Sequence, residues 1–159
     1  MGIIMKVTLR KTGIEGDEKL WRMQVEAFQS MYEKYQDTET SPAAEGVEKT
    51  QMRLNQSFTY YYYIEADNEI VGATRIVDKH ETGKSKRLSP LFIMPEHRNK
   101  GIAQRAIELA EEIHGSSDWE LVTILQEEGN CHLYEKMGYH QTGETVVVNE
   151  RMTLVVYIK

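Results

Sequence analysis

An almost uninterrupted apolar segment, Leu88 to Met94, constrains the fold of this chain more than any other feature. Apolar residues that do not alternate with polar ones are typical of a strand covered on both faces. A helix with one apolar face is expected from Gly101 to His114, and a second buried strand from Trp119 to Leu125. A strand, a crossover helix and a further strand indicate a parallel pair inside the sheet.

Pro90 interrupts this apolar segment. A proline has no N–H to join a sheet ladder, so inside a central strand it implies a bulge or a local loss of pairing. We therefore expect the ladder to be irregular at Pro90; the alternative is an ordinary proline at a strand edge.

The rest of the pattern predicts a mixed α/β fold, with a central, twisted and mostly antiparallel sheet of six to seven strands and about four helices. Further strands are expected at Ile3 to Arg10, Thr59 to Ala66, Ile70 to Val77, Thr145 to Val148 and Met152 to Ile158. Further helices are expected at Asp17 to Tyr35, Gly46 to Gln56 and Asn130 to Met137.

Length and charge limit the class of protein. The 159 residues suit one domain, residues 1–159, and the formal net charge of -6 argues against a nucleic-acid or anionic-membrane partner. Cys131 is the only cysteine, so neither a disulfide framework nor a metal cluster is expected. With no recognisable signal segment, the sequence predicts a cytoplasmic protein.

The turn before the helix at Gly101 has the composition of an anion site. The first N–H groups of a helix lack internal partners, and the helix dipole adds positive charge there. Gly101 would allow close approach of a bulky group, while Arg98 and Lys100 add charge. This favours a phosphate or pyrophosphate cradle; the alternative is a simple turn with solvated cations. Neither a P-loop nor a dinucleotide fingerprint is present.

Two motifs resemble those of GCN5-related N-acetyltransferases, the GNAT superfamily. RNKGIA, Arg98 to Ala103, is similar to the family's (Q/R)xxGx(G/A) motif after an apolar strand. LYEKMGY, Leu133 to Tyr139, resembles the LYEKxGF segment after the next strand. Together with the element order, the resemblance covers nearly the whole chain and implies a GNAT-like fold whose parallel pair splays apart.

The resemblance implies acetyl-coenzyme A as co-substrate and no metal. It also implies that Tyr134 protonates the leaving thiolate, whereas a structural reading makes Tyr134 a helix tyrosine with its ring in the core. Asn130 is the candidate for an amide contact to the cofactor. The remaining cofactor-binding residues implied are Leu91, Phe92 and Ile93 for the pantetheine arm, and Arg98, Asn99, Lys100, Gly101, Ile102 and Ala103 for the pyrophosphate.

The sequence departs from the family pattern at two points. Glu127 stands seven residues before Tyr134, where the family carries an asparagine. The apolar strand also lacks the glutamate that often serves as the base, which leaves Glu65, Asp78 or a water chain as candidates.

The resemblance implies an N-acetyltransferase that acetylates a primary amine of a small molecule or peptide by direct attack. The alternative is a non-catalytic regulatory domain that binds acetyl-coenzyme A. Acidic residues at Asp37, Glu39 and Glu45 would suit a cationic acceptor. The sequence also leaves open whether the chain forms a homodimer.

Overall fold

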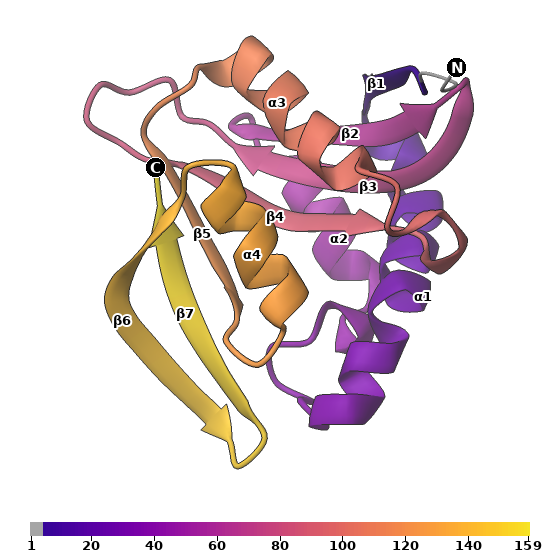
Figure 1. The fold of residues 1–159 in the computed structure, drawn as a ribbon. Helices are drawn as coiled ribbons and strands as arrows, with labels where there is room; N and C mark the ends of the chain where they lie inside the picture. Colours follow the sequence, from indigo (N-terminus) through magenta and orange to yellow (C-terminus); the bar gives the residue numbers. More distant parts are fainter. Residues whose placement is uncertain (1–4) are drawn as a thin grey trace, which may run out of the picture.

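Seven strands form one sheet in the computed structural model, which describes residues 5–159 (Figure 1). Their order is β1-β2-β3-β4-β5-β7-β6, and of these neighbours only β4 and β5 run parallel. The strands are β1 Val7–Thr12, β2 Thr59–Ala66, β3 Glu69–Val77, β4 Lys86–Ile93, β5 Trp119–Ile124, β6 His140–Asn149 and β7 Met152–Ile158. The predicted mixed α/β fold with one parallel pair is confirmed.

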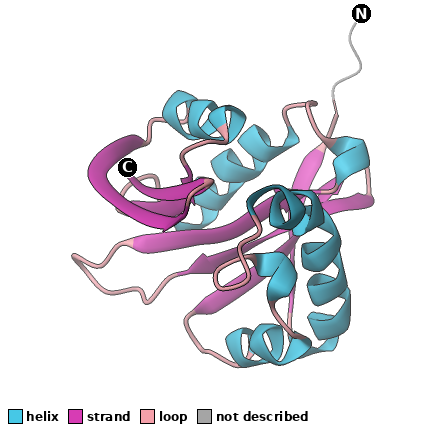
Figure 2. Cartoon of the chain, turned by 90° about the horizontal axis from the view of Figure 1, so that it is seen from below, coloured by secondary structure: helices cyan, strands magenta, loops and turns pink. Residues whose placement is uncertain are grey.

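Helices lie on both faces of the sheet (Figure 2). The α-helices are α1 Asp17–Tyr35, α2 Val47–Leu54, α3 Ile102–His114 and α4 Glu128–Lys136, and the short 3-10 helices are η1 Ile14–Gly16, η2 Pro42–Ala44 and η3 Pro95–His97. On β2, Tyr61 and Tyr63 pack with the α1 residues Leu20 and Ala27, whereas Tyr62 packs with α3 on the opposite face. Three successive tyrosines of one strand, Tyr61 to Tyr63, are therefore buried on alternating faces, whereas Tyr60 is half-buried.

The predicted element boundaries agree best where an apolar stripe marks them. The bounds of α1 and β2 match the prediction. In contrast, α4 begins at Glu128 rather than Asn130, and β6 begins at His140 rather than Thr145. The first eight residues of β6 are exposed, and its early part, which has no hydrophobic pattern, pairs with β7 at His140 and Gln141. Residues 3 and 4 of the expected first strand lie outside the described residues.

The bulge expected at Pro90 is present. Thr74 pairs with Leu91 but Ile76 pairs with Leu88, so Ser89 and Pro90 together oppose one residue of β3. The Thr74 hydroxyl donates to the carbonyl of Pro90 at 3.0 Å, which fixes the bulged segment against β3.

The parallel pair splays beyond its first two residue pairs. β4 and β5 pair at Lys86 with Trp119 and at Arg87 with Glu120, and no further pairing between them occurs within residues 5–159. From Leu88 to Ile93, one edge of β4 is therefore free of β5. The splay and the bulge meet at the same stretch of β4, and this is where the candidate site lies.

Candidate active site

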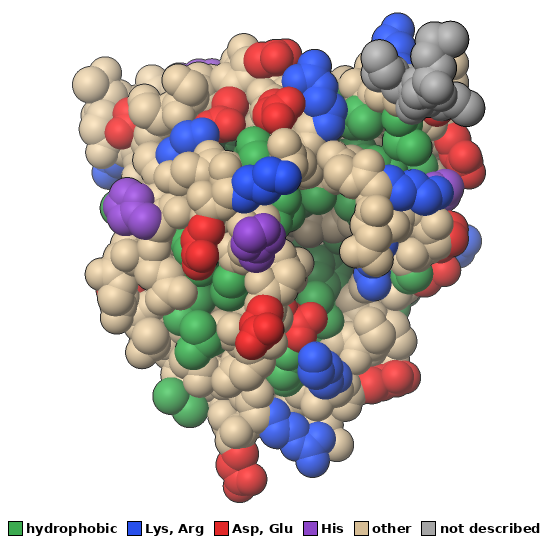
Figure 3. Space-filling model, in the orientation of Figure 1, with side chains coloured by type: hydrophobic (Ala, Val, Ile, Leu, Met, Phe, Trp, Pro, Cys, Tyr) green, Lys and Arg blue, Asp and Glu red, His purple; other side chains and the backbone are tan. Residues whose placement is uncertain are grey.

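A cavity of about 600 Å³ lies beside the splayed strands. Its walls come from α1, the end of β4, the start of α3, and α4. Figure 3 shows the hollow in the middle of the molecule, with hydrophobic side chains on its walls. The cavity brings together both segments that resemble the GNAT motifs, Arg98 to Ala103 and Leu133 to Tyr139, although 29 residues separate them in the sequence.

The start of α3 offers unpartnered amides to this cavity. The first helical hydrogen bond that closes onto Gly101 comes from Arg105 N, so the preceding N–H groups of Ile102, Ala103 and Gln104 lack helical partners. No side chain of residues 5–159 caps this end of the helix. Gly101 has φ 78°, which favours glycine, and a Cβ there would meet nothing within 4 Å. The helix end is therefore open and carries the positive end of the dipole.

The two cations of the turn are placed differently: Arg98 lines the cavity, but its guanidinium is already bonded to the protein, and Lys100 lies outside the cavity. The guanidinium of Arg98 donates from Nε to the Ile93 carbonyl at 2.9 Å and from Nη2 to the Ala27 carbonyl at 2.8 Å. Arg98 therefore ties the turn to β4 and α1. Lys100 is exposed and is not a lining residue. Any anion at this helix end would be held mainly by backbone amides.

The structure brings nearly all of the predicted site residues together. Leu91, Phe92 and Ile93 form the β4 wall, Asn130 lies on the α4 side, and every predicted cofactor-binding residue except Lys100 lines the cavity. Sequence reasoning missed Gln104 and Gly129, both of which also line it. Gly129 could have been found from the sequence. A glycine in the first turn of the short helix α4 lowers helix stability, which suggests that a ligand or a neighbouring segment must approach the backbone there.

Tyr134 lies where this cavity meets a second one of about 220 Å³. Its ring packs edge-on against Tyr139, with the ring centroids 5.9 Å apart. Desolvation by the surrounding protein raises the pKa of Tyr134 to about 12. Among the described residues, the hydroxyl has no hydrogen-bond partner, so a bound molecule could accept its proton.

The second cavity begins at Tyr134 and extends along the bulged segment of β4. The end of α1, the loop after it, the bulge, β5 and β7 form its walls. Five residues line both cavities: Phe28, Met31, Leu91, Asn130 and Tyr134. The two cavities are therefore adjacent, and Tyr134 belongs to the wall that they share.

Comparison with known proteins decides the family. A model of the acetyltransferase (GNAT) family matches residues 19–139, which is most of the chain. The chain belongs to the GNAT family of acetyltransferases.

Two relatives of this GNAT chain are N-acetyltransferase 8 from Mus musculus, 33% identical over 93 residues, and its counterpart from Rattus norvegicus, 29% identical over 102 residues. The matches cover 55% and 60% of this chain. The chain spans less than half the length of these relatives, 41% and 46%.

A solved structure supports the fold assignment. The spermidine N-acetyltransferase from Vibrio cholerae, in complex with CoA and spermine, superposes with a TM-score of 0.73 at 19% identity, covering 96% of this chain and 94% of that chain. At this level of identity the likeness concerns the fold. None of the helices in the described part of the GNAT chain has both the length and the apolar character needed to cross a membrane.

Glu127, where the family carries asparagine, has a structural role here. The hydroxyl of Tyr35 and Lys34 Nζ both donate to its carboxylate, Lys34 at 2.9 Å. Burial alone would raise the pKa of Glu127, but these two hydrogen bonds and the charge of Lys34 outweigh it and hold the pKa below its ordinary value. Glu127 lines the larger cavity as a carboxylate that stays ionised.

The candidate bases named from the sequence lie elsewhere. Glu65 pairs with Arg10 at the β1–β2 edge. Asp78 bonds to His114 Nδ1 at 2.8 Å, and His114 Nε2 lies 2.9 Å from the Tyr62 hydroxyl. Neither carboxylate lines either cavity. Cys131 also lies outside both, with its sulfur 3.7 Å from the Ile124 carbonyl.

Proposed function

We propose that this chain is an acetyl-coenzyme A-dependent N-acetyltransferase, with residues 1–159 forming one acetyltransferase domain. The observation that carries the proposal is the position of Tyr134, which lines both cavities and whose hydroxyl has no hydrogen-bond partner among residues 5–159. One cavity has an open helix end that suits a pyrophosphate, and the other has room for an acceptor.

The larger cavity fits acetyl-coenzyme A, whose thioester would supply the activated acetyl group. The amides at the start of α3 would hold the pyrophosphate, since nothing occupies the space in front of Gly101. The free edge of β4 at Leu91, Phe92 and Ile93 would pair with the amide groups of the pantetheine arm. Asn130 lies on the opposite wall and would add a side-chain amide.

The reaction needs a free amine and a proton for the leaving thiolate. An alkyl amine with a pKa near 10 is unprotonated in only about one molecule per thousand at pH 7, so the site must favour proton loss before direct attack. Tyr134 would donate the proton to the thiolate, because its raised pKa keeps the hydroxyl protonated at neutral pH. No covalent enzyme intermediate is involved.

The acceptor is proposed to be a primary amine of a small molecule or a peptide. The Vibrio cholerae relative in fold is named for an amine substrate, spermidine. The single, buried Cys131 and the net charge of -6 fit a cytoplasmic enzyme without a nucleic-acid partner.

Two measurements test the proposal. Calorimetry should detect binding of coenzyme A, and thiol release from acetyl-coenzyme A should rise above background when primary amines are added. If coenzyme A binds but no amine in a broad panel yields acetylated product, the chain is a non-catalytic binding domain. If coenzyme A does not bind, both readings are wrong.

A further inference from the structure

We propose that the acceptor is a small amine with one positive charge and an apolar body, and that the carboxylate of Asp37 binds its ammonium group in the initial complex, before that group loses its proton to water and attacks the thioester. The inference rests on the proposed function, because it takes the 220 Å³ cavity as the acceptor site. It concerns which amine enters, rather than whether acetyl transfer occurs.

Asp37 is held in one orientation by the loop that follows α1. Its side chain is buried, at 3% exposure for the residue, and Oδ1 accepts hydrogen bonds from the amides of Glu39 at 3.0 Å and Thr40 at 2.9 Å. The Thr40 hydroxyl donates to Oδ2. The carboxylate is therefore fixed before any ligand arrives, and about one of its four acceptor sites remains for another donor.

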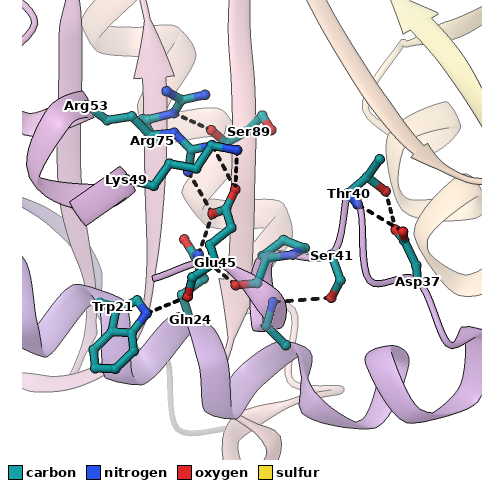
Figure 4. A network of polar contacts seen from close by, with 12 residues as sticks. Trp21, Gln24, Asp37, Thr40, Ser41, Glu45, Lys49, Arg53, Arg75 and Ser89 are labelled. Atoms are coloured by element: carbon teal, nitrogen blue, oxygen red, sulfur yellow. Dashed lines mark hydrogen bonds and ion pairs between the residues drawn. The ribbon is translucent and has the colours of Figure 1, made fainter. Parts of the chain in front are cut away.

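No cation in the described part of the chain neutralises Asp37. Within residues 5–159 it takes part in no ion pair, and Figure 4 shows it and Thr40 apart from the cluster around Glu45. In that cluster the guanidinium of Arg53 binds both oxygens of Glu45 at 3.0 Å. The partly buried carboxylate of Glu45 is therefore paired, whereas the buried carboxylate of Asp37 is in no ion pair among the described residues. A cationic ligand would supply the missing partner.

Asp37 is also the only charged residue among those that line the smaller cavity. The other lining side chains include Phe28, Met31, Pro90 and Leu154, so one ammonium group would find a partner and a second would not. A further desolvated ammonium is costly when it is unpaired. This lining disfavours a polyamine and favours a monoamine.

The apolar end of the cavity indicates where the body of the amine would lie. Ile124 of β5 pairs with Leu154 of β7, and both line the cavity together with Val122. Val122 keeps 40% of its surface exposed, and the main contacts of α1 and α2 with the sheet are on β2, β3 and β4. An alkyl or aryl group would cover this surface while the ammonium lies against Asp37.

The inference is tested by the affinity of amines for the protein saturated with coenzyme A, measured by calorimetry, since this readout does not depend on turnover. Butylamine is the charged probe. Its 2,2-difluoro analogue has nearly the same shape, but fluorine lowers the basicity of the amine and reduces its charge at pH 8. Spermidine probes a ligand with several charges. We expect butylamine to bind more tightly than either of the others.

Asp37→Asn removes the charge but keeps Oδ1 as the acceptor for the two loop amides. We expect it to weaken butylamine binding about tenfold or more, as loss of a charged hydrogen bond does, and to change difluorobutylamine binding much less. Glu39→Gln is the matched control, because it removes a charge from an exposed position in the same loop and should change neither affinity. Val122→Thr keeps the side-chain shape and should reduce the gain in affinity from ethylamine to hexylamine.

The outcomes separate the two proposals. Butylamine binding that depends on Asp37 without acetyl transfer would refute the proposed function, and with it the role of the amine as acceptor, but it would leave the ammonium site at Asp37 standing. Equal weakening of both amines by Asp37→Asn, or spermidine binding more tightly than butylamine, would overturn the inference even if transfer is fast. If the variant does not fold, the wild-type comparison decides: equal affinities for butylamine and its difluoro analogue would also overturn it.

Discussion

The hydroxyl of Tyr35 donates a hydrogen bond to the carboxylate of Glu127 and joins the last residue of α1 to the residue before α4. Lys34 binds the same carboxylate, and Asn149 Nδ2 donates to the Tyr35 carbonyl at 2.8 Å. The end of α1 is therefore held by two segments from the second half of the chain. Because Tyr35 lines the smaller cavity and Glu127 the larger one, this contact fixes the walls of both.

Removal of the Tyr35 hydroxyl should lower stability. Tyr35→Phe leaves a partly buried carboxylate without one of its donors, and we expect the free energy of unfolding to fall by about 1–3 kcal/mol. Urea denaturation measures it, and Tyr32→Phe on the same helix is the control. A double-mutant cycle with Glu127→Gln should show coupling between the two sites, and strictly additive effects would contradict the contact.

The contribution of Glu127 to stability should depend on pH. The folded-state pKa is lowered by the hydrogen bonds from Tyr35 and Lys34, so the stabilisation is present above the unfolded-state pKa of about 4.3 and is lost as the pH falls through the folded-state value. Wild type should therefore exceed Glu127→Gln in stability at pH 7, and the difference should shrink below about pH 4. A difference that stays constant from pH 7 to pH 3 would contradict the lowered pKa.

Gly101 should be required for coenzyme A binding beyond its effect on folding. Gly101→Val strains the backbone at φ 78° and places a branched side chain in the open space before α3. Gly83→Val creates comparable strain at φ 82° in the loop between β3 and β4, away from both cavities. Both variants should lose stability, but only Gly101→Val should weaken coenzyme A binding, about tenfold or more by calorimetry. Equal binding by the two variants would place the pyrophosphate elsewhere.

The sequence predicted those features that have a local or periodic cause. The apolar stripe of α1 set its bounds, and Pro90, which lacks an N–H, marked the bulge that the pairing of Thr74 and Ile76 reveals. The residues of the two family motifs were identified because they lie in short contiguous segments. Their assembly around one cavity follows from the splay of β4 and β5.

Other features of the site depend on contacts across the chain. The role of Glu127 is set by Tyr35, which lies 92 residues away, so it was visible only as a departure from the family pattern. The sequence offered no reason to distinguish the three acidic residues of the loop, Asp37, Glu39 and Glu45, as binding sites for a cation. Their contacts in the fold distinguish them. Glu45 is paired with Arg53, Glu39 is exposed, and Asp37 lines a cavity. The early start of β6 was missed because its exposed residues carry no hydrophobic pattern.

Tyr134 should remain a proton donor throughout the usual range of assay pH. With its pKa raised to about 12, the hydroxyl keeps its proton at pH 10, while the acceptor amine loses its own. The rate at saturating acetyl-coenzyme A should therefore rise from pH 6 towards pH 10 without a fall due to Tyr134. A descending limb below pH 10 that disappears in Tyr134→Phe would show that the tyrosine ionises too early for this role.

The most direct test of the account is the rate at which N-acetylated amine forms, followed by mass spectrometry for wild type, Tyr134→Phe and Tyr139→Phe. Tyr139 makes the same edge-on ring contact but lines neither cavity. We predict that Tyr134→Phe lowers the rate about a hundredfold or more with unchanged coenzyme A affinity, as expected for loss of a general acid, whereas Tyr139→Phe leaves it within a few-fold of wild type. Equal rates for wild type and Tyr134→Phe would contradict the central claim that Tyr134 protonates the leaving thiolate.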